Sequence, residues 1–268
     1  MAYKPKTYDP ASKEPFTISR SKIDIFTECQ RCAYLDMRLG VKRVQGPAFT
    51  LNNAVDTLLK NEFDTHRSNG SAHPFMEQYG IDAVPLNDQR MEEWRDALRR
   101  GIKFLHEPTN ILIRGGVDDV WVDPKGELII VDYKATSKKE GPKTTNDLYP
   151  AYKKQMEIYQ WLFRKNGFAV SNTGYFVYVN GRADAKAFDG RLEFDVVLIA
   201  YKGDDSWVEP TVNELKKVLS QDEIPPIGVA FDGIKPCDYC TYRESAGNAL
   251  REHVAKNKKV LKNSTLFE

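Results

Sequence analysis

A stretch of alternating apolar and polar residues near the middle of the chain predicts a β-hairpin. Residues 114–138 read RGGVDDVWVDPKGELIIVDYKATSK, with two apolar runs separated by DPKG at 123–126. Proline presets the φ of the second turn residue, and glycine accepts the positive φ that a three-residue hairpin loop needs after a type I turn. Pairing the strands outward from that turn places Asp118 opposite Asp132, with the two carboxylates about 5 Å apart on one face.

Apolar residues recur every three or four positions elsewhere in the chain, which is the spacing of a helix with one face on a core. The first such helix is expected to follow the capping serines Ser19 and Ser21 and to end at Gly40. The predicted helices cover residues 22–39, 51–66, 91–105, 152–165 and 208–220, and further strands are predicted at 173–180 and 192–200. In the second helix the residues expected to face the core are Leu51, Val55, Leu58, Leu59 and Phe63. His66 and His73 are expected to be exposed in a loop.

The composition is that of a globular protein with room for one large domain or two small ones. The chain has 268 residues, of which 41% are hydrophobic and 29% charged. Its formal net charge of +1 means that any nucleic-acid surface must be a local basic patch. The sequence contains no apolar run of the roughly 20 residues that a membrane span needs, and its first residues lack the apolar core of a signal peptide. We therefore expect a cytoplasmic protein without a membrane partner.

The hairpin carries the candidate chemistry. Because side chains alternate along a strand, Asp132 and Lys134 share a face, and the register brings Asp118 to the same face. Two facing carboxylates repel unless a cation lies between them, and hard oxygen ligands suit Mg²⁺ or Mn²⁺. The alternative for these residues is a cross-strand ion pair on the surface.

The motifs in and after the hairpin resemble those of the PD-(D/E)XK nuclease superfamily. Gly115-Gly116-Val117-Asp118 is similar to its G-x-x-D strand, and Asp132-Tyr133-Lys134 is similar to its D/E-x-K. Gln155 and Tyr159 lie one turn apart on the helix predicted at 152–165 and resemble the Q-x-x-x-Y motif of the RecB-like branch. The alternative for that helix is an ordinary amphipathic helix whose core residues are Met156, Ile158, Trp161 and Leu162.

The resemblance implies an α/β fold with a restriction-endonuclease-like core, in which helices flank a central mixed β-sheet. It implies a single nuclease domain at 1–268, with its catalytic core at 111–200. Asp118, Asp132 and the carbonyl of Tyr133 would hold Mg²⁺ or Mn²⁺, Lys134 would orient the attacking water, and the Gln155 and Tyr159 helix would pack beside this site. Related nucleases complete the metal shell with a histidine, and Asp56 stands at that position here. Asp56 is either a third carboxylate ligand or a solvated helix residue.

Four cysteines form two matched pairs. Cys29 and Cys32 are expected one turn apart on the first helix, and Cys237 and Cys240 follow Pro236. In a reducing compartment this arrangement indicates metal ligation rather than disulfides. The resemblance to CRISPR-associated iron–sulfur exonucleases favours a four-iron four-sulfur cluster. Four thiolates also suit a structural Zn²⁺, the alternative.

This sequence departs from those iron–sulfur enzymes in having Ala246 where they have a last cysteine, and in having Cys32 as an additional one. The four-cysteine site is expected to join the two ends of the chain, through a subregion formed by residues 17–50 and 224–250. It would close a loop of some two hundred residues.

Basic residues near the candidate site are the candidate DNA contacts. The loop after the hairpin, SKKEGPKTT at 137–145, contains Lys138, Lys139 and Lys143. Arginines on the helix predicted at 91–105 are expected to be solvated or to contact phosphate. Taken together, these features predict a metal-dependent DNA nuclease, with an exonuclease on single strands or DNA ends as the favoured form. The alternatives are a nuclease-like module that binds DNA without cutting it, and a structural subunit of a DNA-repair or CRISPR-adaptation complex.

Overall fold

The computed structural model describes residues 6–44, 46, 50–229 and 235–264. Parts of the predicted cysteine subregions, residues 45, 47–49 and 230–234, lie outside the described residues. The chain divides into two compact units. The sheet unit comprises Lys13–Asp24 and Gly46–Asn213, and the cysteine unit comprises Met1–Ser12, Ile25–Gln45 and Glu214–Glu268. The expectation of a single domain stays a prediction.

The predicted hairpin is present in the sheet unit with the predicted register. Strands β5 (Asp119–Val122) and β6 (Leu128–Thr136) are antiparallel, and Val122 pairs with Leu128. The amide of Gly126 donates to the carbonyl of Asp123 at 3.0 Å, and Gly126 has φ 83°. The turn is therefore the glycine-containing three-residue loop that the sequence predicts.

The hairpin belongs to a five-stranded mixed sheet of order β2-β5-β6-β7-β8. Strand β6 is parallel to β7 (Thr173–Gly181), and the chain crosses between them through helix α6 (Pro150–Lys165). The edge strands are β2 (Val84–Pro85) and β8 (Phe194–Lys202), each antiparallel to its neighbour. Parallel neighbours need such a helical crossover, and it is this crossover that brings α6 beside β6.

A second sheet has three strands in the order β1-β4-β3. Strand β4 (Ile111–Gly115) is central, parallel to β1 (Phe16–Ser19) and antiparallel to β3 (Ile102–His106). Only residues 116–118 separate β4 from β5 of the larger sheet. The G-x-x-D segment is thus the connection between the two sheets.

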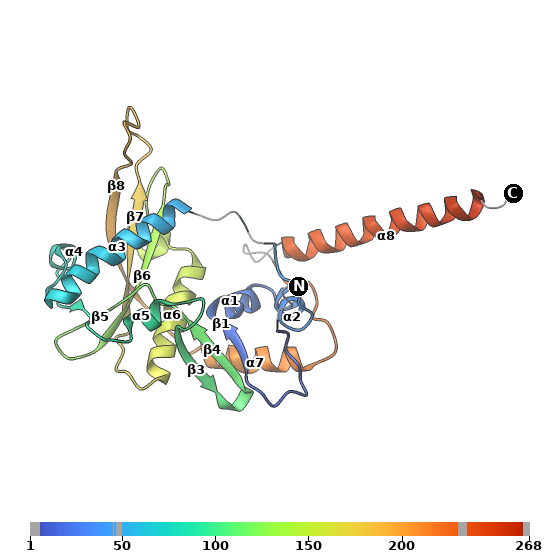
Figure 1. The fold of residues 1–268 in the computed structure, drawn as a ribbon, viewed down its shortest axis with the longest axis horizontal. Helices are drawn as coiled ribbons and strands as arrows, with labels where there is room; N and C mark the ends of the chain where they lie inside the picture. The colour runs from blue at the N-terminus through green and yellow to red at the C-terminus, as the bar shows by residue number, and fades with distance from the viewer. Residues whose placement is uncertain (1–5, 45, 47–49, 230–234, 265–268) are drawn as a thin grey trace. The chain divides into compact units, whose positions relative to one another are not determined.

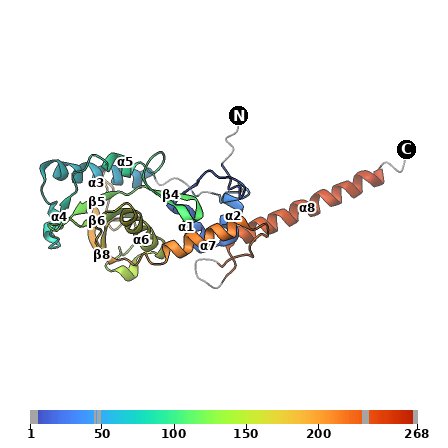
Figure 2. The ribbon, with the colours of Figure 1, turned by 90° about the horizontal axis from the view of Figure 1, so that it is seen from below.

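Helices α3 (Thr50–Asn69) and α6 supply most of the cover over the hairpin strands (Figures 1 and 2). Phe63 of α3 is buried in one cluster with Ile129 and Val131 of β6, which point to the same face of the strand. Helix α6 contacts β6 and also β3 and β4 of the smaller sheet. Eight consecutive residues of α6, 156–163, are buried, because the helix meets both sheets.

The cysteine unit is mainly helical. Helix α2 (Gln30–Met37) and helix α8 (Asp238–Ser264) lie entirely within it, and α1 (Arg20–Glu28) and α7 (Val208–Ser220) each begin in the sheet unit. The remaining short helices, all in the sheet unit, are α4 (Pro74–Gln78), α5 (Met91–Arg95), η1 (Glu107–Thr109) and η2 (Thr145–Asp147).

The helix predicted at 22–39 is wrong as a single element, because the chain breaks between α1 and α2 at Cys29. This residue is extended, with φ −158° and ψ 106°, and its sulfur accepts from the amide of Cys32 at 3.5 Å. Cys29 is therefore the N-cap of α2, not a residue one turn before Cys32 on a continuous helix. The break turns its thiol toward the other cysteines.

The helix predicted at 91–105 is also wrong. It ends after five residues as α5, and β3 begins at Ile102. The helix stops at Asp96, whose ψ of 76° is not helical, and Gly101, with φ 72°, folds the chain back so that its amide donates to the carbonyl of Glu93 at 2.9 Å. Leu98, which would be one of the apolar positions of a helix over 91–105, is 85% exposed.

Two further expectations about side chains are wrong. Leu51 and Leu58 of α3 are exposed, so the helix buries a narrower face, through Leu59 and Phe63. His73 is buried rather than exposed, stacked on Phe63 with ring centroids 4.2 Å apart, and its Nε2 lies 3.0 Å from Oε1 of Glu62. His66 belongs to α3.

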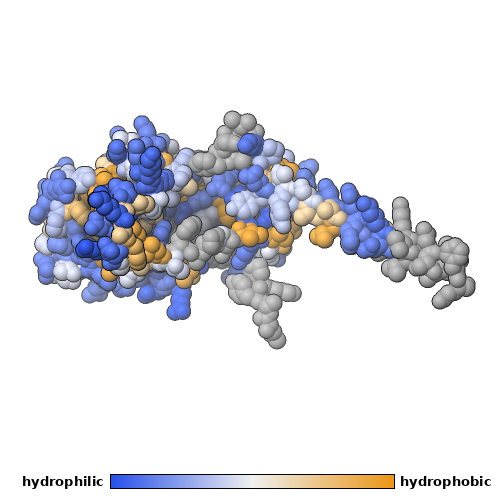
Figure 3. All heavy atoms as spheres, turned by 90° about the horizontal axis from the view of Figure 1, so that it is seen from above, coloured by the Kyte–Doolittle hydropathy of each residue, from blue (hydrophilic) through white to orange (hydrophobic). Residues whose placement is uncertain are grey.

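Hydrophilic side chains cover most of the face drawn in Figure 3. The described side chains of α8 include exposed apolar ones, Tyr239, Tyr242, Leu250 and Val254. No helix within the described ranges is both long and apolar enough to cross a membrane.

Candidate active site and cysteine site

Asp118 and Asp132 meet at the end of the hairpin farthest from its turn. Asp118 immediately precedes β5, and its Oδ2 accepts from the main-chain amide of Tyr133 at 2.9 Å. The pairing of Asp119 with Val131 sets this register, which places Asp118 level with Asp132 as the sequence predicts.

Lys134 and Gln155 complete a group around the Asp132 carboxylate. The Lys134 ammonium forms an ion pair with Oδ2 of Asp132. Nε2 of Gln155 donates to Oδ1 of Asp132 at 2.6 Å, and Oε1 of Gln155 accepts from Lys134 at 3.2 Å. One amide thus bridges the carboxylate and the ammonium, which fixes both side chains relative to α6.

At both Asp132 and Lys134, burial and the charge of the other residue shift the pKa in opposite directions. Burial raises the pKa of Asp132 to about 6, the neighbouring ammonium of Lys134 opposes the rise, and the carboxylate of Asp118 adds to it. Burial by itself lowers the pKa of Lys134, but the carboxylates of Asp132 and Asp118 outweigh it and the net shift is upward. Lys134 therefore stays charged, whereas Asp132 titrates close to neutrality.

The ring of Tyr159 leaves no room for a side chain at Gly115, the first glycine of the G-x-x-D segment. A Cβ at position 115 would lie 2.5 Å from Cε1 of Tyr159, closer than side chains approach one another. Tyr159 is buried, its hydroxyl lies 3.5 Å from Nε2 of Gln155, and burial raises its pKa while the charge of Arg20 opposes the rise. Gly115 thus lets α6 approach β4 closely enough for Gln155 to reach Asp132.

A cavity of about 390 Å³ opens beside these residues. Asp118, Tyr133 and Lys134 line it from the hairpin, and Asp56 lines it from α3. Its other lining residues are Asn52, Asn53, Val55, Leu59, Ala135 and Tyr152. Nδ2 of Asn52 donates to the carbonyl of Ala135 at 2.8 Å, which ties α3 to the end of β6.

Asp56 is paired with a lysine that the sequence analysis did not single out. Nζ of Lys60 lies 2.8 Å from Oδ2 of Asp56 and 3.5 Å from Oδ1 of Asp118. One ammonium therefore bridges the two carboxylates across the cavity and offsets one of their two negative charges. The donor chemistry of the cavity fits a hard cation, because Asp118 and Asp56 line it with carboxylate oxygens. Asp132 is fully buried behind Lys134, with its two oxygens engaged by Lys134 and Gln155. The role of Asp56 as a metal ligand stays a prediction.

A second group of charges surrounds the fully buried Asp119. Asp119, next to Asp118, is completely buried and forms ion pairs with Arg67 and, at 3.3 Å, with Arg95. Its Oδ2 accepts from the Tyr133 hydroxyl at 2.8 Å. Nε of Arg95 also donates to the carbonyl of Asp118 at 3.0 Å.

The network around Asp119 thus supports the main chain at the candidate site. Asp64 completes it, 2.9 Å from Arg67 and 2.7 Å from Arg95. This network was not predicted from the sequence, although the acidic doublet at 118–119 was a signal. Arg95 was expected to be solvated or to contact phosphate, whereas its side chain is largely buried beside Asp119.

The predicted DNA-contacting lysines lie on the loop between β6 and η2. The amide of Lys138 donates to Oδ1 of Asn180 at 2.9 Å, and Nδ2 of Asn180 donates to the carbonyl of Lys138 at 3.0 Å. Lys138 and Lys139 line a second cavity, of about 290 Å³. Lys143 is exposed at the far end of the loop, where its amide donates to Asp147 at 2.9 Å. The structure therefore groups two of the three lysines.

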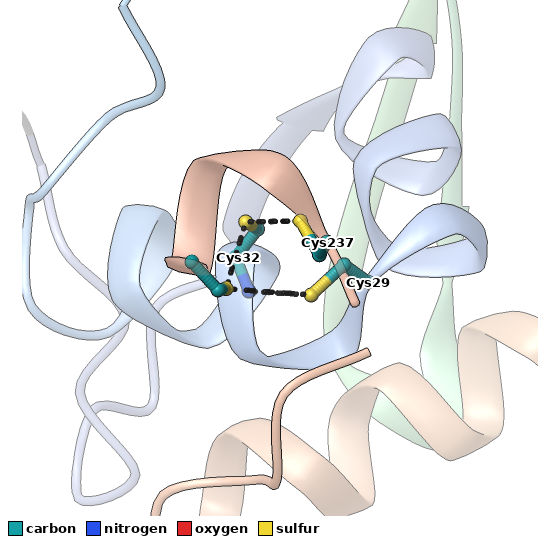
Figure 4. Close-up of side chains that lie close together, drawn as sticks. Cys29, Cys32 and Cys237 are labelled. Atoms are coloured by element: carbon teal, nitrogen blue, oxygen red, sulfur yellow. Dashed lines mark hydrogen bonds between the residues drawn. The ribbon is translucent and has the colours of Figure 1, made fainter. Parts of the chain in front are cut away.

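The four cysteines converge in the cysteine unit, where each is buried and none is in a disulfide (Figure 4). Their sulfur atoms all lie within 4.8 Å of one another. The closest pairs are Cys32 and Cys240 at 3.4 Å, Cys32 and Cys237 at 3.6 Å, and Cys29 and Cys240 at 3.7 Å. Burial raises the pKa of Cys32 and of Cys240, so a bound cation must displace protons there.

The surroundings of the thiols are closely fitted. A Cβ at Gly228 would lie 2.9 Å from the sulfur of Cys29, and the carbonyl of Gly228 accepts from the amide of Cys237 at 2.7 Å. Arg43 approaches the sulfur of Cys237 at 3.9 Å, and Arg243 approaches that of Cys32 at 3.6 Å. Two guanidinium groups thus lie where thiolate charge would develop.

Comparison with known proteins identifies a family for the chain. The family model described as the PD-(D/E)XK nuclease superfamily matches residues 17–245. The chain belongs to the PD-(D/E)XK nuclease superfamily. A solved structure titled "Crystal structure of SSO0001" is 16% identical, with a TM-score of 0.36, over 80% of this chain and 81% of that one. No curated protein matches the chain.

Membership of the PD-(D/E)XK superfamily accounts for the mixed sheet between α3 and α6, and the mixed α/β fold expected from the sequence is confirmed. The meeting of the N-terminal and C-terminal regions at the four cysteines is confirmed as well. The family is one of nucleases, which implies that the chain binds nucleic acid.

Proposed function

We propose that this protein is a metal-dependent deoxyribonuclease that hydrolyses phosphodiester bonds at single-stranded DNA or DNA ends. The observation that carries the proposal is the meeting of Asp118, Asp132 and Lys134 beside one cavity, with Gln155 bridging the last two. We further propose that the whole chain works as one nuclease domain, because the family match includes parts of both units.

In the proposed reaction, Asp118, Asp132 and the carbonyl of Tyr133 hold Mg²⁺ or Mn²⁺, with Asp56 as a further ligand. The cation would supply Lewis-acid stabilisation of the phosphate and lower the pKa of a bound water. The ammonium of Lys134 orients the attacking water and stabilises the charge that develops on phosphate oxygens. Gln155 keeps that ammonium beside Asp132, and Tyr159 supports Gln155 from the next turn of α6.

A direct test compares the degradation of end-labelled single-stranded and double-stranded DNA with Mg²⁺, with Mn²⁺ and without added divalent cation. Lys134→Ala is expected to abolish metal-dependent products, while Lys125→Ala, at the exposed hairpin turn, is expected to cut like the wild type. Products that persist unchanged in Lys134→Ala would refute the proposed site. The position of the label in the products gives the polarity of digestion.

A second candidate function is favoured by one observation. Asp56, which stands in for a histidine, is paired with Lys60, and the same ammonium faces Asp118. The Lys60 ammonium lies beside two proposed ligands of the cation, Asp56 and Asp118. This position favours a module that binds DNA without cutting it. Tight DNA binding by a well-folded protein that yields no products with either metal would support this candidate over the nuclease.

We propose that the four cysteines hold a single structural Zn²⁺ rather than the iron–sulfur cluster that the sequence analysis favoured. Four sulfurs around one zinc, each at about 2.3 Å, lie about 3.8 Å apart at the corners of a tetrahedron. The closest sulfur pairs here, at 3.4 to 3.7 Å, are consistent with that spacing. In a four-iron cluster each thiolate binds its own iron, which requires a wider arrangement.

Metal analysis of anaerobically purified protein tests this assignment. The expected result is one zinc per chain and a colourless protein, and four irons with the brown absorbance of a cluster would overturn it. Lys134→Ala is expected to retain the zinc, whereas Cys32→Ser is expected to lose it.

The biological setting is the last part of the proposal. The RecB-like order of the motifs supports a cytoplasmic enzyme that works in DNA repair or CRISPR adaptation, with protein partners in such a complex. The unpaired, buried cysteines are consistent with a reducing compartment. Purification of the tagged protein from its own host, followed by identification of co-purifying proteins, tests the partners.

A further inference from the structure

Two tyrosines and two lysines form a continuous row beside the candidate active site. In order, the members of this row are Lys134, Tyr152, Tyr149 and Lys138. Nζ of Lys134 lies 4.7 Å from the ring centre of Tyr152, and the rings of Tyr152 and Tyr149 meet edge to face with centroids 5.4 Å apart. Nζ of Lys138 lies 4.3 Å from the ring centre of Tyr149. The row therefore runs from the proposed catalytic lysine to the basic loop.

The row connects the two cavities of this region. Tyr152 lines the cavity that Asp118 and Lys134 also line, and Lys138 lines the cavity of about 290 Å³. Tyr149 lies between these two residues in the row and is 45% exposed. A strand that passes from one cavity to the other would meet this ring on the way.

The backbone of the row is held in place at Tyr149 and at Lys138. Tyr149 is the N-cap of α6 and is followed by Pro150, so its backbone is set by the start of the helix. The main chain of Lys138 is fixed by its two hydrogen bonds with the side chain of Asn180, which is itself buried at the end of β7. Such a fixed aromatic surface suits stacking better than a ring on a mobile loop does, because less conformational entropy is lost on binding.

The chemistry of the row selects for unpaired nucleotides. Inside a duplex each base is stacked on its neighbours, whereas an unpaired base has a face free to stack on an aromatic ring. The ammonium groups at the two ends of the row are placed to neutralise phosphates of the same strand. The interior of a duplex offers the phosphates but not the base faces.

We infer that Tyr149, supported by Tyr152 and flanked by Lys138, is the stacking site for an unpaired base next to the scissile phosphate, and that this row gives the protein its preference for single strands. The inference deepens the proposed nuclease function and rests on it. It assigns to Tyr149 a role in choosing the substrate, separate from the hydrolysis performed around Asp132.

Binding is measured without added divalent cation, so that the strand stays intact, by the fluorescence anisotropy of a labelled single strand and of a blunt duplex of equal length. Loss of stacking in Tyr149→Ala is expected to weaken single-strand binding about tenfold and to leave duplex binding unchanged. Tyr149→Trp is expected to retain single-strand binding. Tyr79→Ala, which removes another exposed tyrosine of the sheet unit, is the matched control and is expected to bind like the wild type.

A 2-aminopurine base in the single strand reports stacking itself. Its fluorescence is expected to be quenched on binding to the wild type and to Tyr149→Trp, and to remain high with Tyr149→Ala. Equal losses for single strand and duplex, or unchanged binding by Tyr149→Ala, would overturn the inference. Cleavage is measured separately with Mg²⁺, so a protein that binds through Tyr149 but never cuts would refute the nuclease and leave the stacking site standing.

Discussion

Tyr133 lies diagonally across the hairpin from Asp118, and its main-chain amide donates to Oδ2 of Asp118 at 2.9 Å. The same tyrosine donates its hydroxyl to Asp119 at 2.8 Å. One residue of β6 therefore holds two adjacent aspartates, one in the cavity and one in the core. The position of the Asp118 carboxylate is fixed by the fold before any ligand arrives.

Asp118→Asn is the variant that isolates the charge at this position. The amide keeps the shape of the side chain, but it removes a negative charge from the proposed cation site, so we expect metal-dependent cleavage to fall about 100-fold or more. Initial rates on end-labelled single strands measure the effect. Asp82→Asn, which removes a charge from an exposed loop, is expected to cleave at the wild-type rate. A comparable loss in both variants would mean that the effect is not specific to the site.

Metal affinity is expected to depend on pH through Asp132. With the pKa of Asp132 at about 6, the carboxylate is ionised above that pH and accepts a cation, whereas below it a proton competes for the same oxygen. The affinity for Mn²⁺ should thus fall by up to about tenfold per pH unit below 6 and be nearly constant above 7. Calorimetric titration with Mn²⁺ at several pH values measures the dependence.

Lys134→Met extends the same test. Because the Lys134 ammonium opposes the rise in the pKa of Asp132, its removal is expected to move the midpoint of the pH dependence upward. An affinity that does not change between pH 5 and 8 in the wild type, or a midpoint that moves downward in Lys134→Met, would contradict this assignment.

The buried network around Asp119 is expected to dominate stability. Asp119→Asn leaves Arg67 and Arg95 facing a neutral group in a fully buried place, which typically costs about 3–5 kcal/mol of unfolding free energy. Tyr133→Phe, which removes one hydrogen bond to Asp119, should cost only about 1 kcal/mol. Urea denaturation followed by tryptophan fluorescence gives both values. A smaller effect for Asp119→Asn than for Tyr133→Phe would show that the arginines find other partners.

Gly115→Ala tests the close approach of α6 to β4. The added methyl group would overlap the ring of Tyr159, so a loss of about 1–3 kcal/mol in unfolding free energy is expected. Thermal and urea unfolding measure it. Gly247→Ala is the contrasting variant, because its added methyl group would have no neighbour nearer than 3.5 Å and alanine favours the helix. Equal destabilisation by both changes would argue against the close contact.

The sequence predicted the hairpin and its register because both depend on local features. The turn at 123–126 fixes which residues face each other, and no distant partner is needed to place Asp118 opposite Asp132. The helix 208–220 was likewise predicted with the bounds it has. The motif residues Asp132, Lys134 and Gln155 lie in contact, as their resemblance to a family implied.

Features set by distant partners were missed. Asp119 is 52 residues from Arg67 and 24 from Arg95, and nothing in its neighbourhood in the sequence identifies either partner. The apolar spacing at 91, 94, 98, 102 and 105 fits a helix, but it cannot reveal that Gly101 turns the chain and that Ile102 starts a strand. The break at Cys29 arises from the other cysteines, two of which lie more than two hundred residues away.

That separation has a consequence for how the protein is made. Cys29 and Cys240 are 211 residues apart, and the whole second part of the sheet unit, Gly46–Asn213, lies between them in the chain. During synthesis the first two thiols leave the ribosome long before the other two, so a four-thiolate metal site cannot form until residue 240 has emerged. By then every strand of both sheets has already been translated. A chain that stops early can contain every residue of the candidate active site and still lack the ligands for its metal, so metal content distinguishes full-length protein from such fragments.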